Sequence, residues 1–267
     1  MSRDFVHLHV HSGYSILDSV IRIPDLCQRV SDLGMSAVAV TDHGGLMGAV
    51  EFLDAAKHAG VKPIIGCEVR ISTGNLPGFE GYPTNTGCHD LILLAENNEG
   101  YQNLVRIVSV PRFGEFPGQP IVDKAFLRRH GKGLIATSAC GKGEIPSLLK
   151  TAGEGAAERA LEEYREIFNE GRFYLEIQDT GISGQPQVNE KLIRLARRTG
   201  TPLVATNDCH YLCRNDSREL EILRSMRKGV TISEWESAGD PMPRNYVRSA
   251  WEMERIFGHV SPESLAN

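Results

Sequence analysis

The stretch HLHVHSGYSILD, residues 7–18, sets the first expectation about this chain. Histidines occupy every second position and an aspartate closes the stretch: His7, His9, His11 and Asp18. Alternate side chains of a β-strand point to one face, so the three imidazoles are expected to project together while the apolar residues between them pack. Because histidine is the commonest metal ligand among side chains, the pattern suits a metal site as well as a solvated polar face. The rest of the chain has to separate the two.

Composition limits the class of protein. The 267 residues, 41% of them hydrophobic, suffice for one large domain with a buried core. No apolar run reaches the length of a membrane span and the start lacks the apolar core of a signal peptide, so we expect no membrane partner and a cytoplasmic location. Six scattered cysteines then indicate reduced thiols. The net charge of −5 argues against a strongly basic nucleic-acid binder, but it allows a nucleic-acid substrate if bound cations supply positive charge.

Short apolar runs alternate with helix-like runs, as is typical of strands buried on both faces of a parallel sheet. The expected strands are 4–11, 37–42, 62–71, 90–95, 133–139, 172–178 and 202–207. The expected helices are 24–33, 46–59, 98–110, 121–130, 154–170 and 185–199. This order predicts an α/β fold, either a barrel or a doubly wound sheet. We favour the barrel because candidate ligands come from nearly every strand and must converge on one point.

Two segments fall outside this alternation. Residues 73–88 form a long loop rich in glycine and proline, and loops of that length in compact domains are often functional. From about residue 214 the pattern becomes helical and polar, and the closing SPESLAN looks like the opening of another helix. We therefore expect the chain to be a piece of a longer protein.

Metal-competent side chains gather near the ends of six strand units. They are His9, His11, Asp18, His43, Glu68, His89, Cys140, Asp208 and His210. Taken singly each has an ordinary explanation, since a cysteine packs in cores and an aspartate caps helices, but their joint placement is hard to obtain by accident. His89 fits least well because it precedes its strand and would have to enter from the loop 73–88.

Nine mixed nitrogen, oxygen and sulfur ligands exceed the needs of one ion. They suit two or three divalent cations with Glu68 bridging, and ligands of this kind favour Zn²⁺, Mn²⁺ or Fe²⁺ over Mg²⁺ or Ca²⁺. Clustered cations are typical of phosphoester cleavage, in which one activates a water and others neutralise phosphoryl oxygens and the leaving alkoxide. Basic residues near strand ends, such as Lys142 or Arg214, are candidate phosphate contacts.

The motifs HLHVHS, TDHG, GCE, HDLILLAEN, ATSAC and NDCHY together resemble the polymerase and histidinol phosphatase (PHP) family. The resemblance implies a distorted seven-stranded (β/α)7 barrel with a trinuclear metal site. It implies one metal held by His9, His11, Glu68 and Asp208, and a second that shares Glu68 and adds His89 and Cys140. The third would take Asp18, His43 and His210. Glu68 and Asp208 are the expected catalytic residues, and His7 is left with a structural role.

Within that family, the stretches LILLAENNEGYQNLVRIVS, GLIATSACGKGEIP and FYLEIQDTG resemble the branch that opens the alpha subunit of bacterial DNA polymerase III. The resemblance implies a metal-dependent phosphoesterase barrel over residues 1–230 and a segment, 231–267, that leads toward a missing polymerase region. Two places depart from the pattern. Ser19 replaces the usual glycine, and residues 233–247 match poorly.

Three functions suit this reading. The first is a 3′–5′ proofreading exonuclease domain acting on single-stranded or frayed 3′ DNA, with the rest of the polymerase chain and other replisome subunits as partners. The second is a small-molecule phosphomonoesterase of the histidinol phosphatase type, which the polymerase-like stretches disfavour. The third is a non-catalytic structural or docking domain of the polymerase. The first is favoured because scaffold members of the family have lost ligands, whereas a full set is present here.

Overall fold

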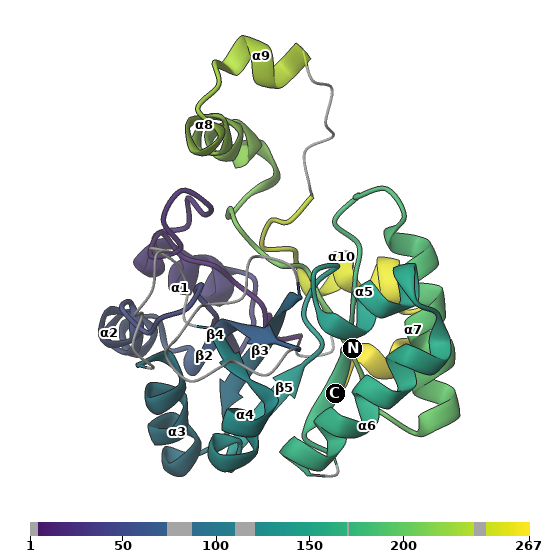
Figure 1. The fold of residues 1–267 in the computed structure, drawn as a ribbon. Coiled ribbons are helices and arrows are strands. Elements are labelled where there is room, and N and C mark those ends of the chain that lie inside the picture. The colour runs from purple at the N-terminus through teal and green to yellow at the C-terminus, as the bar shows by residue number, and fades with distance from the viewer. Residues whose placement is uncertain (1–4, 74–86, 110–120, 170, 238–243) are drawn as a thin grey trace.

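A mixed, curled β-sheet flanked by helices forms the centre of the computed structural model, which describes residues 5–73, 87–109, 121–169, 171–237 and 244–267 (Figure 1). Its strands are β1 (Ala37–Val40), β2 (Lys62–Ser72), β3 (Cys88–Ala95), β4 (Ile121–Asp123), β5 (Leu134–Thr137), β6 (Phe173–Gln178) and β7 (Leu203–Thr206). They follow the order β1-β2-β3-β5-β6-β7, with β4 pairing separately with β2. The α/β fold class predicted from the sequence is therefore confirmed.

Most of the helices lie around this sheet (Figure 1). They are α1 (Ile23–Asp32), α2 (Ala49–Ala59), α3 (Asn98–Val108), α4 (Lys124–His130), α5 (Glu144–Thr151), α6 (Glu154–Phe168), α7 (Gln185–Thr199), α8 (Ser217–Lys228), α9 (Ile232–Ser237) and α10 (Ala250–Phe257), with short 3-10 turns at Arg214–Asp216 and Pro262–Leu265. Among the described residues, no helix is both long and apolar enough to cross a bilayer. The buried apolar residues of β1, β2, β3 and β5 to β7 pack against α1 to α7 in one large core.

A complete (β/α)7 barrel is not what the strands form. β3 runs antiparallel to both β2 and β5, so the all-parallel arrangement of a (β/α)7 barrel is broken at β3. The other pairs, β1 with β2, β5 with β6 and β6 with β7, are parallel. Direction cannot be read from a short apolar run, because such a run buries equally well in either orientation.

The expected first strand, residues 4–11, is also absent as a strand. Its described part makes only isolated bridges, His7 with Val38 of β1 and Val10 with Cys209 beyond β7. One reason is that the backbone N–H of Val10 donates to the hydroxyl of Thr41 rather than to a ladder carbonyl. The segment nevertheless lies between the two edges of the sheet, and this position puts its histidines next to residues that follow β1 and β7.

The helices around β4 and α5 differ from those expected. The predicted helix 121–130 begins with the short strand β4, and Asp123 at the end of β4 caps α4 by accepting a hydrogen bond from the backbone of Phe126 at 2.7 Å. Helix α5 was not expected at all. The loop 73–88 falls almost wholly outside the described residues, so its functional role stays a prediction.

The C-terminal part of the chain leaves the sheet and then returns to it. Helices α8 and α9 project away from the rest of the molecule (Figure 1). Tyr246 pairs with Tyr211, and the turn Pro262–Leu265 packs against β7. The predicted boundary at residue 230 has no independent support and stays a prediction.

Gly100 supplies a test of the packing between α3 and β5. A Cβ atom at Gly100 would lie 1.7 Å from the carbonyl oxygen of Gly133. Alanine improves helix propensity by about 1 kcal/mol, but this backbone overlap outweighs the gain, and we expect Gly100→Ala to lower the free energy of unfolding by about 2 kcal/mol. Urea denaturation measures the change. Gly155→Ala in α6, where the nearest atom is 3.9 Å away, is the control and should not destabilise; equal effects would contradict the packing.

Candidate metal centre

Seven of the predicted ligands meet at one place. They come from the N-terminal segment, the turn after it, the chain after β1, the middle of β2 and the chain after β7: His9, His11, Asp18, His43, Glu68, Asp208 and His210. Parallel strands end at the same edge of a sheet, which is why residues that follow β1 and β7 lie together. Asp208 has φ +45°, a strained value for a residue other than glycine.

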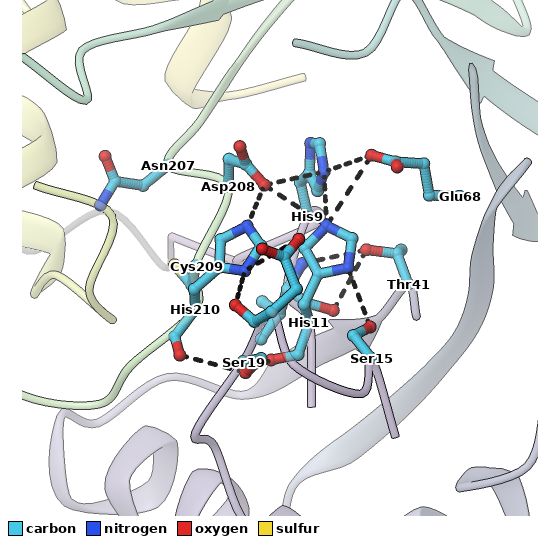
Figure 2. Close-up of polar contacts among 12 residues, drawn as sticks. His9, His11, Ser15, Ser19, Thr41, Glu68, Asn207, Asp208, Cys209 and His210 are labelled. Carbon is cyan, nitrogen blue, oxygen red and sulfur yellow. Dashed lines mark hydrogen bonds and ion pairs between the residues drawn. The ribbon is translucent and has the colours of Figure 1, made fainter. Parts of the chain in front are cut away.

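His9, His11 and Asp208 form the first group (Figure 2). The two histidine Nε2 atoms lie 3.1 Å apart, and each lies within 3.3 Å of Asp208 Oδ1. His210 joins from the other side, with its Nε2 3.1 Å from the same carboxylate oxygen. Both N-terminal histidines are fully buried, so no solvent separates these atoms.

His11, His43 and Glu68 form the second group. Glu68 reaches both groups, because one carboxylate oxygen lies 3.4 Å from His9 Nε2 and the other lies 2.7 Å from His43 Nδ1. Asp18 is 2.8 Å from the opposite ring nitrogen of His43. Glu68 thus lies between the two groups, and its bridging role stays a prediction.

Contacts behind the cluster orient the rings. His9 Nδ1 donates to Glu176 at 2.7 Å, and His210 Nδ1 donates to the backbone carbonyl of Asp18 at 2.7 Å. The hydroxyl of Ser15 donates to Asp42, so its oxygen is left to accept from His11 Nδ1 at 3.2 Å. A ring that donates from Nδ1 presents the lone pair of Nε2. This is the usual arrangement of a metal-bound histidine.

These contacts test whether a metal fits. With Nδ1 protonated on His9 and His11, their Nε2 lone pairs would face each other at 3.1 Å, so either a proton on His9 or a metal cation has to lie between them. His43 Nδ1 is buried and makes no hydrogen bond, although the Glu68 carboxylate is 2.7 Å away. Imidazole nitrogens and carboxylate oxygens arranged in this way are the donor set of a divalent transition metal.

The electrostatics reflect the crowding of like groups. Burial lowers the pKa of His11 to about 4, helped by the neighbouring rings of His43 and His210. Burial also opposes the charge on His43, but the carboxylates of Asp18 and Glu68 raise its pKa to about 10. Burial likewise opposes the charge on His9, but the carboxylates of Glu176 and Asp208 raise its pKa well above the usual value. His9 and His43 are therefore the rings that carry an extra proton. Divalent cations would take the place of these protons.

Of the remaining two predicted ligands, Cys140 reaches the site and His89 does not. Cys140 borders the same cavity as Glu68 and Asp208, and burial followed by the charges of these acids raises the pKa of its thiol. His89 instead points its Nδ1 at the carbonyl of Lys142, 3.3 Å away, and does not line the cavity.

The register of β3 explains this difference. Ile92 lies opposite Glu68 in the antiparallel pair, so their side chains share a face. Asp90, two residues from Ile92, shares that face and lines the cavity, whereas His89 is on the other side. Burial and then the Glu68 carboxylate raise the pKa of Asp90 to about 6. His89 is the expected ligand by residue type, but the alternation of side chains along the strand selects Asp90.

The comparisons with known proteins identify the family of the chain. The sequence profile of the PHP domain matches residues 7–180. The chain belongs to the PHP domain family. The family expected from the sequence motifs is therefore confirmed.

Two relatives of this PHP domain are alpha subunits of DNA polymerase III. It is 39% identical to the DNA polymerase III subunit alpha of Helicobacter pylori, covering 100% of this chain and 22% of that protein. It is also 39% identical to the same subunit of Thermus aquaticus, covering 95% of this chain and 21% of the relative. The PHP domain thus spans about a fifth of the length of these relatives. Among solved structures, an amidohydrolase from Chromobacterium violaceum has a TM-score of 0.48 and 16% identity, covering 82% of this chain and 96% of the other.

The candidate metal centre of this PHP domain opens into a cavity of about 680 Å³. Lys142, expected from the sequence as a phosphate contact, lines this cavity. Further basic side chains and one aromatic ring also line it, and these were not expected: Lys150, Arg224, Arg227, Lys228 and Trp235. Arg227 Nη1 lies 2.9 Å from Asp18 Oδ1, which ties α8 to the cluster. A basic stretch in a polar helix carries no sequence signal for a site, because such helices are usually solvated.

Ser19, the residue that departs from the family pattern, has a structural use. Its hydroxyl contacts two backbone carbonyls, those of His11 and His210. It therefore links the two segments that carry the first group of ligands. Serine in place of the usual glycine at position 19 thus adds a hydrogen-bonded link between these two segments.

Glu176 is the residue that most directly positions a ligand of this PHP domain. It is buried, accepts from His9 and from Gln178 at 2.7 Å each, and is also contacted by the hydroxyls of Thr137 and Thr206. We expect Glu176→Gln to weaken Mn²⁺ or Zn²⁺ binding about 10- to 100-fold, because a carboxylate behind a histidine raises its basicity and fixes its tautomer. Competitive chelator titration measures this. Glu166→Gln, on the exposed face of α6, is the control; equal affinity of both variants would contradict the positioning role.

Proposed function

We propose that this PHP domain is a metal-dependent phosphodiesterase, which removes nucleotides from the 3′ end of DNA within a longer DNA polymerase III alpha-like chain. One observation carries the proposal: a connected set of imidazole and carboxylate ligands, already oriented from behind, lies at the base of a cavity with a basic wall. The similarity to the polymerase alpha subunits supports the replication context.

Two or three divalent cations, Zn²⁺, Mn²⁺ or Fe²⁺, suit the ligand set. His9, His11 and Asp208 would hold one, with Glu68 shared toward His43, Asp18 and His210. Asp90 takes the place of His89 beside Cys140, since the aspartate and not the histidine faces the cavity. When bound, such cations lower the pKa of a coordinated water and neutralise phosphoryl oxygens.

The chain's own residues supply binding and charge. Lys142 is exposed at the cavity, where desolvation opposes its charge but Cys140 and Asp90 hold its pKa above the usual value, so it stays a cation facing the site. Arg224 and Arg227 approach from α8. A phosphodiester entering the cavity meets donors from both sides. Guanidinium groups match phosphate oxygens in pairs.

Trp235 favours a nucleic-acid end over a small phosphomonoester. Its half-buried ring lines the cavity, with Lys228 Nζ 4.4 Å from the ring centroid. Aromatic rings beside basic groups are the usual platform for an unpaired base. A cavity of about 680 Å³ is the size of a small-ligand site, and it admits a terminal nucleotide more readily than a duplex.

A primer-shortening assay tests the proposal. A 5′-labelled DNA primer with a mismatched 3′ end is incubated with the metal-loaded chain in Mn²⁺ or Zn²⁺, and a ladder that shortens from the 3′ end is expected. The products should be nucleoside 5′-monophosphates, since the 3′ oxygen departs with the remaining strand. A fully metallated protein that leaves the primer intact would favour a structural or docking role. Release of phosphate from a small phosphomonoester, without action on DNA, would favour a phosphatase.

A further inference from the structure

A second polar pocket, of about 300 Å³, lies beside the metal cavity and is separate from it. It is lined by Asp179, Arg214, Arg244, Tyr246, Arg248, Glu252, Arg255 and Ile256. The segment 244–248 is its common wall with the metal cavity, because Asn245 lines the cavity while Arg244 and Tyr246 line the second pocket. None of these residues is a candidate metal ligand. The pocket therefore needs its own explanation.

Arg248 provides the clearest indication of what the pocket binds. Its side chain is 4% exposed, and its Nη1 has no hydrogen-bond partner among the described residues. Nη2 donates to the carbonyls of Asp179 and Arg244, at 2.9 and 3.2 Å, and the guanidinium lies 5.4 Å from the ring centroid of Tyr246. A buried cation with an unused donor is costly unless a partner meets it. The missing partner is an acceptor with negative charge.

The other arginines increase the positive charge around this donor. Arg214, Arg244 and Arg255 are exposed, and within the described ranges none of them lies within 4.0 Å of a carboxylate oxygen. Two acids also line the pocket, so its four arginines leave a net positive charge. Glu252 lies near Arg248 and accepts hydrogen bonds from Tyr246 at 2.6 Å and from Ser249, while Asp179 offers its backbone carbonyl to Arg248.

We propose that this pocket is a phosphate-binding site. Three exposed guanidinium groups around the buried unused donor of Arg248 match the charge and the several oxygens of a phosphate better than those of a halide or a single hydroxyl. The site is distinct from the metal centre and does not depend on phosphodiester cleavage. Arg214, a candidate phosphate contact by its sequence position, lines this pocket.

His7 fixes this pocket to the metal segment. Its ring is fully buried, and its Nε2 donates to the backbone carbonyl of Arg248 at 2.8 Å. On the other side, the carbonyl of Asn245 accepts from the backbone of His210 at 2.8 Å. The phosphate site is thus held against the same segments that carry the metal ligands, and it suits a phosphate of the strand whose end occupies the metal cavity.

Calorimetric titration of the whole chain, chelated to remove metals, tests the site with two probes. The first is inorganic phosphate and the second is a short single-stranded DNA oligonucleotide. We expect Arg214→Gln, Arg244→Gln and Arg255→Gln each to weaken phosphate binding about tenfold. The exposed Arg159→Gln on α6, away from the pocket, should not change it. These three arginines are exposed, so their replacement does not disturb the fold even if an Arg248→Gln variant fails to fold.

The two probes identify the source of the phosphate. Parallel losses with phosphate and with the oligonucleotide support a phosphate of a nucleic-acid strand. A loss with inorganic phosphate alone supports a free phosphate ion. If all three variants bind both probes as the unmodified chain does, the proposal is overturned. Because no metal is present and no cleavage is measured, this result is independent of whether the chain is an exonuclease.

Discussion

Asp208→Asn is expected to lower the rate of 3′-nucleotide release about 1000-fold, which corresponds to about 4 kcal/mol of transition-state stabilisation. Asp208 Oδ1 lies within 3.3 Å of three histidine nitrogens, so it is the anion on which the first group converges. Asparagine keeps the shape of the side chain but removes the charge that holds a cation there. The measurement is the initial rate of primer shortening at saturating Mn²⁺.

The folded state should survive this change. Asp208 is already strained at φ +45°, and asparagine is among the residues that best tolerate the left-handed region. Asp54→Asn, an exposed site on α2, is the matched control for loss of one carboxylate and should keep full activity. If Asp208→Asn keeps both its metal content and its activity, the aspartate is not a ligand.

Removal of the metals is expected to lower the melting temperature by about 5–10 °C for each site saturated at 100 times its dissociation constant. Binding at that level adds about 2.7 kcal/mol to the free energy of unfolding, and 1 kcal/mol shifts the melting temperature of a domain of this size by about 2–4 °C. The cause lies in the cluster itself. Without cations, the buried carboxylate of Glu68 and the half-buried carboxylate of Asp208 have only protonated His9 and His43 to balance them, while His11 stays neutral.

The measurement is a thermal melt before and after chelation, with metal loss confirmed by elemental analysis. Adding back Mn²⁺ or Zn²⁺ should restore the original melting temperature. Asp208→Asn is the control here, because with a weakened site it should lose less stability on chelation than the unmodified chain. An unchanged melt after verified metal loss would show that the cluster does not couple metal binding to folding.

The sequence by itself determined the fold class and most of the centre. Strand-sized apolar runs ending in metal-competent residues predicted that His43, Glu68 and Asp208 would converge, and they do. The reason is local. A buried strand is recognised by its composition, and the polar residues just after it lie at the edge of the sheet, as His43 after β1 and Asp208 after β7 do. Glu68 lies within β2 instead.

Where the prediction failed, the missing information was direction or register. Residues 4–11 have the alternation of a strand, but the hydroxyl of Thr41 takes the place of a backbone partner and leaves isolated bridges. His89 and Asp90 are neighbours in sequence and equally able to bind metal. Only the antiparallel pairing of β3 with β2 decides that the aspartate faces the cavity.

Long-range contacts decided the rest. Glu176 lies 167 positions from His9, and Arg248 lies 241 positions from His7, yet each pair shares a buried hydrogen bond. A carboxylate in a strand and an arginine before a helix carry no local mark of these roles, because the roles depend on which segments meet when the sheet curls. The sequence specified which side chains can bind metal and phosphate, whereas the tertiary structure decided which of them face a common cavity, since strand direction and register arise only from packing.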